Sequence, residues 1–210
     1  MGNYEYVSKN EVRPYEELFE EVFREIQKEL KKKNGLTFSF ALVGSAKRNL
    51  VIRHHNKGFD CDYQLYLQRN KQELSAEEIK KLLIKKFDEK MPSVFDYCED
   101  STSSITIKKK ITKQSRIEFS YDIVIMDLYE DASYILQKNG SGQYIWNKIP
   151  DFASFEDDYS QIEGATMWDD LRERYYKKKM DKINGVRYHD KKPFQILHEA
   201  VNETLQKFHH

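Results

Sequence analysis

Two aspartates one residue apart are the residues of this chain that most clearly indicate chemistry. Asp60 and Asp62 lie in an alternating stretch, residues 59–67, that reads FDCDYQLYL. In a β-strand successive side chains point to opposite faces, so the two carboxylates share one face and the apolar residues share the other. Neighbouring carboxylates repel one another unless a cation lies between them. Oxygen ligands of this kind suit Mg²⁺, which takes one or two protein carboxylates together with substrate phosphates.

The same alternation identifies a third carboxylate. Residues 116–128 read as a strand, RIEFSYDIVIMDL, with Asp122 on its polar side. Glu118 shares that side but lies about 13 Å from Asp122, at ~3.3 Å per residue. Asp127 has the parity of the apolar side and lies at the end of the strand. We therefore predict that Asp122 joins Asp60 and Asp62 as a metal ligand, and we rank it above Glu118 and Asp127.

A glycine and a serine precede the aspartate pair. Residues 36–43 read as a strand that ends at Gly44 and Ser45, where the missing Cβ of glycine permits close approach of the backbone. Unpaired N–H groups at the start of a helix favour anions such as phosphate. Lys47 and Arg48 follow the turn, and each either adds a phosphate contact or faces solvent from the first helical turn.

Taken in order, these elements resemble the nucleotidyltransferases of the DNA polymerase β superfamily. That superfamily has a strand, a Gly-Ser or Gly-Gly turn into a helix, an Asp-x-Asp or Glu-x-Asp strand and a third Asp on a neighbouring strand. Here they read FALVGS at 40–45, FDCD at 59–62 and FSYDIV at 119–124. The long amphipathic segment before the turn looks most like the branch of 2′-5′ oligoadenylate synthetase, cyclic GMP–AMP synthase and the bacterial cyclic-oligonucleotide synthases. The minimal nucleotidyltransferases of toxin–antitoxin systems match less well, since residues 46–48 and 58–59 depart from their pattern.

The resemblance implies an enzyme that moves a nucleoside monophosphate from an NTP to a hydroxyl acceptor and releases pyrophosphate. It implies two Mg²⁺ or Mn²⁺ ions, bridged by Asp60 and Asp62. Asp122 would hold the ion that lowers the pKa of the attacking hydroxyl, and it is also the candidate acceptor of the proton. Gly44 and Ser45 would hold the β- and γ-phosphates.

A lysine from the C-terminal part is also expected at the triphosphate, because resembling enzymes often use one. Lys178 and Lys179 are the candidates, and Lys179 falls on one helical stripe with Trp168 and Tyr175. The alternative is that Lys179 only extends past these aromatic residues to solvent. The acceptor stays open: a nucleotide, RNA, a protein or a small molecule. The competing class of function is a non-catalytic nucleotide-binding regulatory module on the same fold.

Composition excludes some partners. The 35 Lys and Arg balance the 35 Asp and Glu, so the chain has no global field typical of a polyanion binder, and nothing favours binding of duplex nucleic acid. Two cysteines do not support a disulfide framework. No stretch approaches the ~20 apolar residues that span a bilayer. We expect a soluble, cytoplasmic protein with no membrane partner.

Periodicity predicts the elements that position these residues. Residues 12–33 form an amphipathic stripe ended by Asn34 and Gly35, and a capping box at Ser75 starts a helix that runs to Lys90. Residues 103–111 and 115–128 read as a β-hairpin around 112–114, and residues 139–142, NGSG, read as a turn. Tyr144 and Trp146 follow that turn and either stack on a base or pack in the core.

After about residue 150 the pattern becomes helical. A capping box at Thr166 predicts one helix, and Pro193 predicts the first turn of another. The predicted fold class is α+β: a mixed-sheet nucleotidyltransferase lobe with a long N-terminal helix over residues 1–130, and a mostly helical lobe over 131–210 that closes a cleft.

Overall fold

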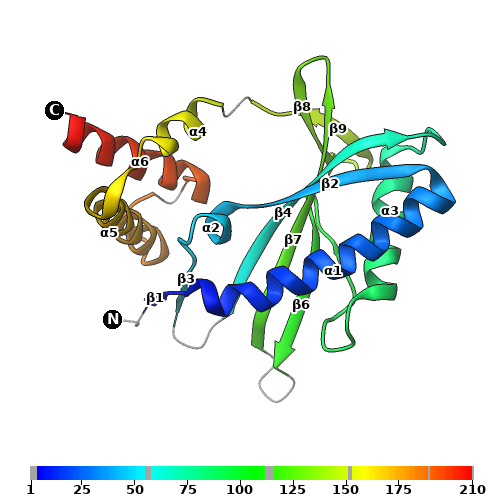
Figure 1. Ribbon diagram of the computed structural model, residues 1–210, viewed down its shortest axis with the longest axis horizontal. Helices are drawn as coiled ribbons and strands as arrows, with labels where there is room; N and C mark the ends of the chain where they lie inside the picture. Colours follow the sequence, from blue (N-terminus) through cyan, green and yellow to red (C-terminus); the bar gives the residue numbers. More distant parts are fainter. Residues whose placement is uncertain (1–3, 55–57, 112–115, 151–152, 189, 210) are drawn as a thin grey trace. The chain divides into compact units, whose positions relative to one another are not determined.

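The computed structural model describes residues 4–54, 58–111, 116–150, 153–188 and 190–209. The chain divides into two compact units, Met1–Ile149 and Pro150–His210. The first contains the strands and three helices, and the second contains helices alone among its described residues (Figure 1). The elements of the first unit are β1 (Tyr4–Tyr6), α1 (Lys9–Asn34), β2 (Leu36–Val43), α2 (Gly44–Lys47), β3 (Ile52–His54), β4 (Phe59–Asn70), α3 (Ala76–Lys90), β5 (Glu99–Asp100), β6 (Ile105–Ile111), β7 (Arg116–Tyr129), β8 (Ala132–Lys138) and β9 (Tyr144–Lys148).

A seven-stranded mixed sheet forms the centre of the first unit. Its strands follow the order β2-β4-β7-β6-β5, and β8 pairs with β7 and with β9. Strands β4 and β7 run parallel, whereas the other pairs are antiparallel. The predicted α+β class with a mixed sheet is confirmed. The predicted turn at 112–114 lies outside the described residues, but β6 and β7 pair as expected.

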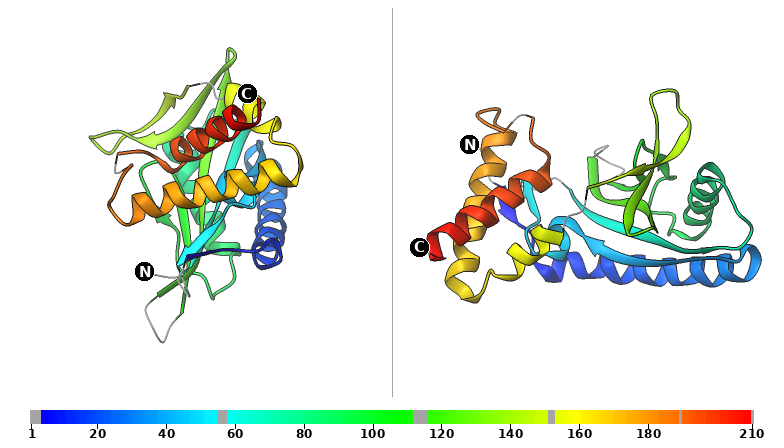
Figure 2. Two further views of the ribbon diagram at one scale, coloured as in Figure 1. Left: turned by 90° about the vertical axis from the view of Figure 1, so that its left-hand side faces the viewer. Right: turned by 90° about the horizontal axis from the view of Figure 1, so that it is seen from above.

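Helix α1 covers one face of this sheet, as Figure 2 shows from two further directions. Phe19 of α1 stacks on Tyr63 of β4 with ring centroids 3.7 Å apart, and Tyr15 stacks on Phe119 of β7 at 3.8 Å. Phe87 of α3 also packs against Phe19, so both long helices lie on the same face. Each such buried side chain contributes about 1.5–3 kcal/mol. The apolar face of β4 and β7 is therefore committed to the core, and the opposite face is left to polar residues.

The ends of the long helices follow from local sequence. Helix α1 begins three residues earlier than predicted, because Ser8 and Glu11 form a capping box, and it ends at Gly35 with φ 59°. The predicted capping box of Ser75 and Glu78 starts α3. At these caps side-chain oxygens accept hydrogen bonds from N–H groups that have no partner within the helix.

The predicted boundary between the units was placed too early. Strands β8 and β9 extend the sheet, so the first unit ends at Ile149 rather than near residue 130. The predicted turn at 139–142 joins these two strands, and Asn139 accepts hydrogen bonds from the backbone of Ser141 and Gln143. Both aromatic residues of β9, Tyr144 and Trp146, pack against the core, which favours their core interpretation over base stacking.

The second unit is a three-helix assembly, α4 (Ala153–Ser160), α5 (Gly164–Ile183) and α6 (Pro193–His209). Helix α6 begins at Pro193 as predicted, and its residues Ile196, Ala200 and Val201 are buried. Helix α5 begins at Gly164, so the predicted capping box at Thr166 is wrong. Glycine at φ 71° lets the chain turn into the helix three residues earlier than a cap at Thr166 would. In the part of the chain that the structure describes, no helix is long and apolar enough to cross a membrane.

Candidate active site on the open face of the sheet

The two aspartate strands lie directly side by side. In the parallel pairing of β4 with β7, Asp62 is opposite Asp122 and Asp60 is opposite Ser120. All three aspartates occupy the face that α1 leaves open, since the intervening residues Cys61 and Tyr63 are buried beneath the helix. The prediction that the three aspartates share one face of the sheet is confirmed. The alternation of side chains along each strand and the register between the strands together place them there.

The three carboxylates converge. Asp60, Asp62 and Asp122 each offer an oxygen atom, and these atoms all lie within 4.8 Å of one another. Asp60 is exposed and the other two are partly buried, so solvent and ligands reach the group from one side. We call these three residues the aspartate cluster.

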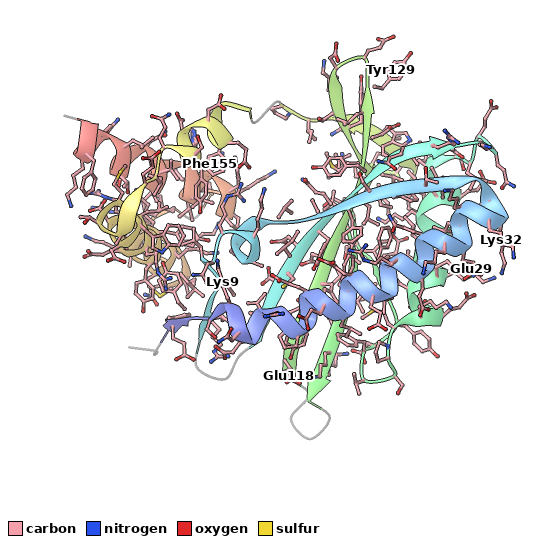
Figure 3. All side chains as sticks on the ribbon, in the orientation of Figure 1. Lys9, Glu29, Lys32, Glu118, Tyr129 and Phe155 are labelled. Atoms are coloured by element: carbon pink, nitrogen blue, oxygen red, sulfur yellow. The ribbon has the colours of Figure 1, made fainter. Side chains whose placement is uncertain are left out.

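The two lower-ranked acids lie elsewhere. Glu118 forms an ion pair with Lys109, with 3.2 Å between Oε2 and Nζ, and it lies near the opposite end of β7 from Tyr129 (Figure 3). Asp127 is outside the cluster, and burial raises the pKa of its carboxyl. The ranking of Asp122 above these two acids is therefore consistent with the structure.

Gly44 lies so close to the aspartate cluster that a side chain there would clash with Asp62. Its φ of 65° is unfavourable for residues with a Cβ, and a Cβ placed there would lie 2.3 Å from Oδ2 of Asp62. The backbone of the turn therefore approaches the carboxylate more closely than any other residue type would allow. Gly44 and Ser45 begin the short helix α2, so the predicted phosphate-binding turn adjoins the metal-ligand candidates.

The basic residues after the turn are placed differently. Arg48 is 8% exposed, and its Nη1 donates a hydrogen bond to the carbonyl of Gly44 at 3.3 Å. It therefore stabilises the turn from the protein interior. Lys47 is exposed and lines a cavity of about 540 Å³ together with Glu16, Glu20 and other residues of α1. The predicted nucleotide contact of Lys47 stays a prediction.

Thr106 is a residue of this site that the sequence did not reveal. It lies on β6 opposite Asp122, and its Oγ1 is 2.5 Å from Oδ1 of that aspartate. The available signal was a hydroxyl-bearing residue on the polar side of the predicted 103–111 strand. Assigning it required the strand register, which shifts at Lys109 and Lys110.

The two predicted lysines belong to the second unit. Lys178 is held within that unit: its Nζ lies 2.7 Å from Glu203 and 3.1 Å from the hydroxyl of Tyr188. Burial alone would lower the pKa of Lys178, but these partners raise it. Lys179 is half-buried, with its Nζ 5.8 Å from the centre of the Tyr175 ring. Their predicted contact with the triphosphate stays a prediction.

The aspartate cluster has the donor set of a divalent-cation site. Ligand oxygens around one Mg²⁺ at 2.0–2.1 Å lie about 3 to 4 Å apart, and those shared by two adjacent ions spread somewhat further. The observed limit of 4.8 Å fits this range after small side-chain adjustments. Carboxylate oxygens alone select hard cations such as Mg²⁺ or Mn²⁺ over ions that prefer nitrogen or sulfur.

Comparison with known proteins supports the predicted resemblance in fold. No protein-family model and no curated protein matches the chain. Among solved structures it is similar to GTP-bound DncV of Vibrio cholerae, with a TM-score of 0.56, 18% identity and coverage of 81% of this chain and 45% of DncV. It is also similar to CdnE of Elizabethkingia meningoseptica, a cyclic dinucleotide synthase solved with GTP and Apcpp. The TM-score is 0.53, the identity is 13%, and the match covers 94% of this chain and 69% of CdnE.

A third similar structure is the CD-NTase CdnG of Bradyrhizobium diazoefficiens in complex with GTP, with a TM-score of 0.53, 15% identity and coverage of 73% of this chain and 42% of CdnG. The chain thus spans less than half the length of DncV and CdnG. At these identities the likeness shows the fold. The resemblance to nucleotidyltransferases of the cyclic-oligonucleotide synthase branch is confirmed at that level.

Proposed function

We propose that this chain is a metal-dependent nucleotidyltransferase that moves a nucleoside monophosphate from an NTP to a hydroxyl. The observation that carries the proposal is the aspartate cluster, with three carboxylate oxygens within 4.8 Å beside a turn that only glycine can make. DncV, CdnG and CdnE, which share the fold, were each solved with GTP bound. Nucleotide binding is therefore the activity that both the site and the fold favour.

In the proposed reaction the acceptor oxygen forms a bond to the α-phosphorus, and the bond from that phosphorus to the bridging oxygen breaks. Pyrophosphate leaves with that oxygen and its electrons. Asp60 and Asp62 would hold the cations, and Asp122 would hold the one nearest the acceptor. Two Mg²⁺ or Mn²⁺ ions held there would neutralise charge on the entering and leaving oxygens.

The remaining groups of the site orient the substrates. The backbone of Gly44 and the hydroxyl of Ser45 would bind the β- and γ-phosphates, as charge-assisted hydrogen bonds to anions are stronger than neutral ones. The acceptor's proton would pass to Asp122 or to solvent. Most of the rate would come from holding the acceptor oxygen in line with the α-phosphorus and from stabilising developing charge.

The test is incubation of the pure protein with each labelled NTP in turn and Mg²⁺ or Mn²⁺, followed by separation of soluble products from protein-bound label. A labelled product with stoichiometric pyrophosphate supports transfer, and its identity reveals the acceptor. An Asp60→Asn/Asp62→Asn protein is the control. Nucleotide binding without turnover by the wild type would instead indicate the non-catalytic module.

A further inference from the structure

The third carboxylate of the cluster is held by a buried hydroxyl. Thr106 is 8% exposed, and its Oγ1 lies 2.5 Å from Oδ1 of Asp122. An ionised carboxylate accepts hydrogen bonds but cannot donate them. The hydroxyl hydrogen of Thr106 is therefore committed to Asp122.

Two serines complete the hydrogen-bond chain behind Thr106. The Oγ atoms of Ser101 and Ser104 lie 3.2 Å and 3.4 Å from Thr106 Oγ1. Since the hydrogen of Thr106 points to the aspartate, the serines donate to its lone pairs. Ser101 is itself anchored, because its carbonyl accepts a hydrogen bond from the buried Lys80 at 2.6 Å. The direction of donation therefore runs from the serines through Thr106 to Asp122.

This arrangement matters because a carboxylate group rotates easily. The terminal torsion of an aspartate side chain has broad, weakly separated minima, so the sheet backbone does not by itself fix the plane of the two oxygens. A short hydrogen bond to Oδ1 from a β-branched residue, whose own χ1 is restricted, fixes that plane. Asp62 is confined differently, by the close approach of Gly44.

We propose that Thr106 is the positioning residue of the active site, and that it orients Asp122 for the cation and the acceptor hydroxyl. The proposal rests on the proposed function, since it assigns Thr106 a role toward the same cation site. Hydrogen-bond partners of metal ligands typically contribute about 10–100-fold to metal affinity or activity. Thr106 would act through Asp122, without contact with the substrate.

The variants isolate the hydroxyl. Thr106→Val keeps the shape of the side chain and removes the hydrogen bond, whereas Thr106→Ser keeps the hydroxyl. Thr102→Val is the matched control, since Thr102 is an exposed threonine in the same segment, and its backbone carbonyl accepts a hydrogen bond from the N–H of Lys138. Mn²⁺ affinity is measured by electron paramagnetic resonance with a non-hydrolysable ATP or GTP analogue, together with kcat, KM and the melting temperature without metal.

We expect Thr106→Val to weaken Mn²⁺ binding and to lower kcat, each by about 10–100-fold, with little change in the KM for the nucleotide. Thr106→Ser should recover most of both losses, and Thr102→Val should match the wild type. Equal losses in the Ser and Val proteins would overturn the proposal, because the hydroxyl would then not be the cause. If Thr106→Val does not fold, Thr106→Ala replaces it in the comparison with the Ser protein, and equal losses in the Ala and Ser proteins would likewise overturn the proposal.

The Mn²⁺ measurements distinguish a failure of the proposed function from a failure of the inference about Thr106. Asp122→Asn should abolish the tight Mn²⁺ site. If Asp122→Asn loses Mn²⁺ while Thr106→Val binds it as the wild type does, the inference about Thr106 is overturned and the metal site stands. If the wild type binds no Mn²⁺ with either analogue, the proposed function is overturned, and the role of Thr106 with it.

Discussion

Two polar clusters in the first unit surround their carboxylates in opposite ways. One is the aspartate cluster. The other is the lysine clasp, formed by Asp100 of β5, Lys80 of α3, Lys138 of β8 and Tyr144 of β9. Both lysine ammonium groups lie 2.9 Å from the Asp100 carboxylate, and Tyr144 donates a hydrogen bond to it. Here a single carboxylate meets two cations, whereas in the aspartate cluster three carboxylates meet each other.

The surroundings of the two groups explain their different roles. Burial alone would raise the pKa of Asp100, but hydrogen bonds from Tyr144, Lys138 and Lys80 outweigh it and lower the pKa to about 2. The charge of Asp100 is thus balanced within the protein, and the clasp joins three strands of the sheet, β5, β8 and β9, to helix α3. Asp122 instead receives its short hydrogen bond from a neutral hydroxyl, so this contact adds no positive charge to the cluster. In the proposed site a divalent cation would supply the positive charge that Asp100 receives from two lysines.

The comparison predicts opposite results for the same isosteric change. Asp60→Asn/Asp62→Asn should lower turnover by at least about 1,000-fold, because the loss of several kcal/mol of cation-mediated stabilisation corresponds to that factor. Without metal the melting temperature should hold or rise, since repulsion between carboxylates is relieved. Turnover assays and thermal melts measure both quantities. A folded double variant with more than a tenth of wild-type turnover would contradict the assignment.

Asp100→Asn should destabilise the protein and leave the aspartate cluster intact. It leaves Lys80, which is 1% exposed, without a counter-charge, and breaking a buried pair costs about 3–5 kcal/mol. The lower value applies because the Asp100 side chain is 28% exposed. Denaturation with urea measures the change in the free energy of unfolding. Unchanged stability would show that the clasp is dispensable.

The pH dependence of stability provides a second check on the clasp. The folded-state pKa of Asp100, about 2, lies below that of an unfolded aspartate, about 3.9. Its contribution is therefore complete above about pH 4 and is lost as the pH falls toward 2. Asp100→Asn should flatten the stability profile in that window, whereas an identical slope in wild type and variant would contradict the assignment.

The aspartate cluster could be predicted from the sequence because it depends on one regular feature. Side chains alternate along a strand with a period of two, so Asp60 and Asp62 share a face, and Asp122 joins them once β4 and β7 pair. The pairing places Asp62 opposite Asp122. The glycine turn is equally local, since a strand that ends at Gly44 already predicts a close approach of the backbone.

Thr106 could not be predicted, because its position depends on long-range register. A hairpin closed at residues 112–114 would place residue 104 opposite Asp122, but the pairing observed is with Thr106. The ladder closes at Ile111 and Arg116, one residue later than a turn over 112–114 gives, and the shift at Lys109 and Lys110 moves every partner beyond it by one more. The sequence pattern places Lys179 on the stripe of Trp168 and Tyr175, whereas the buried residues of α5 are Leu171, Tyr175 and Lys178. This difference leaves the predicted triphosphate contacts of Lys178 and Lys179 as predictions.

Substitution of Gly44 tests how tightly the cluster is packed. In Gly44→Val the side chain would displace the Asp62 carboxylate, and a misplacement of about 1 Å can lower turnover about 100-fold. Gly142→Val is the matched control, because Gly142 also has a positive φ, 81°, but a Cβ there would have open space around it. Both variants should carry similar backbone strain, of about 1–3 kcal/mol. Calorimetry should show weaker NTP binding for Gly44→Val alone, and equal losses in both proteins would assign the effect to strain.

The smallest changes delete one hydroxyl beside the aspartate cluster and one within the clasp. Ser45→Ala should weaken NTP binding by about tenfold, the equivalent of ~1.5 kcal/mol for a hydrogen bond to a charged group, and should leave stability without ligand unchanged. Tyr144→Phe removes the hydroxyl that donates to Asp100, so it should lower the free energy of unfolding by a similar amount and leave NTP affinity unchanged. Calorimetry and urea denaturation on both proteins complete a two-by-two comparison. If Ser45→Ala lowered stability without changing affinity, Ser45 would be a structural residue like Tyr144, and the phosphates would have to bind elsewhere.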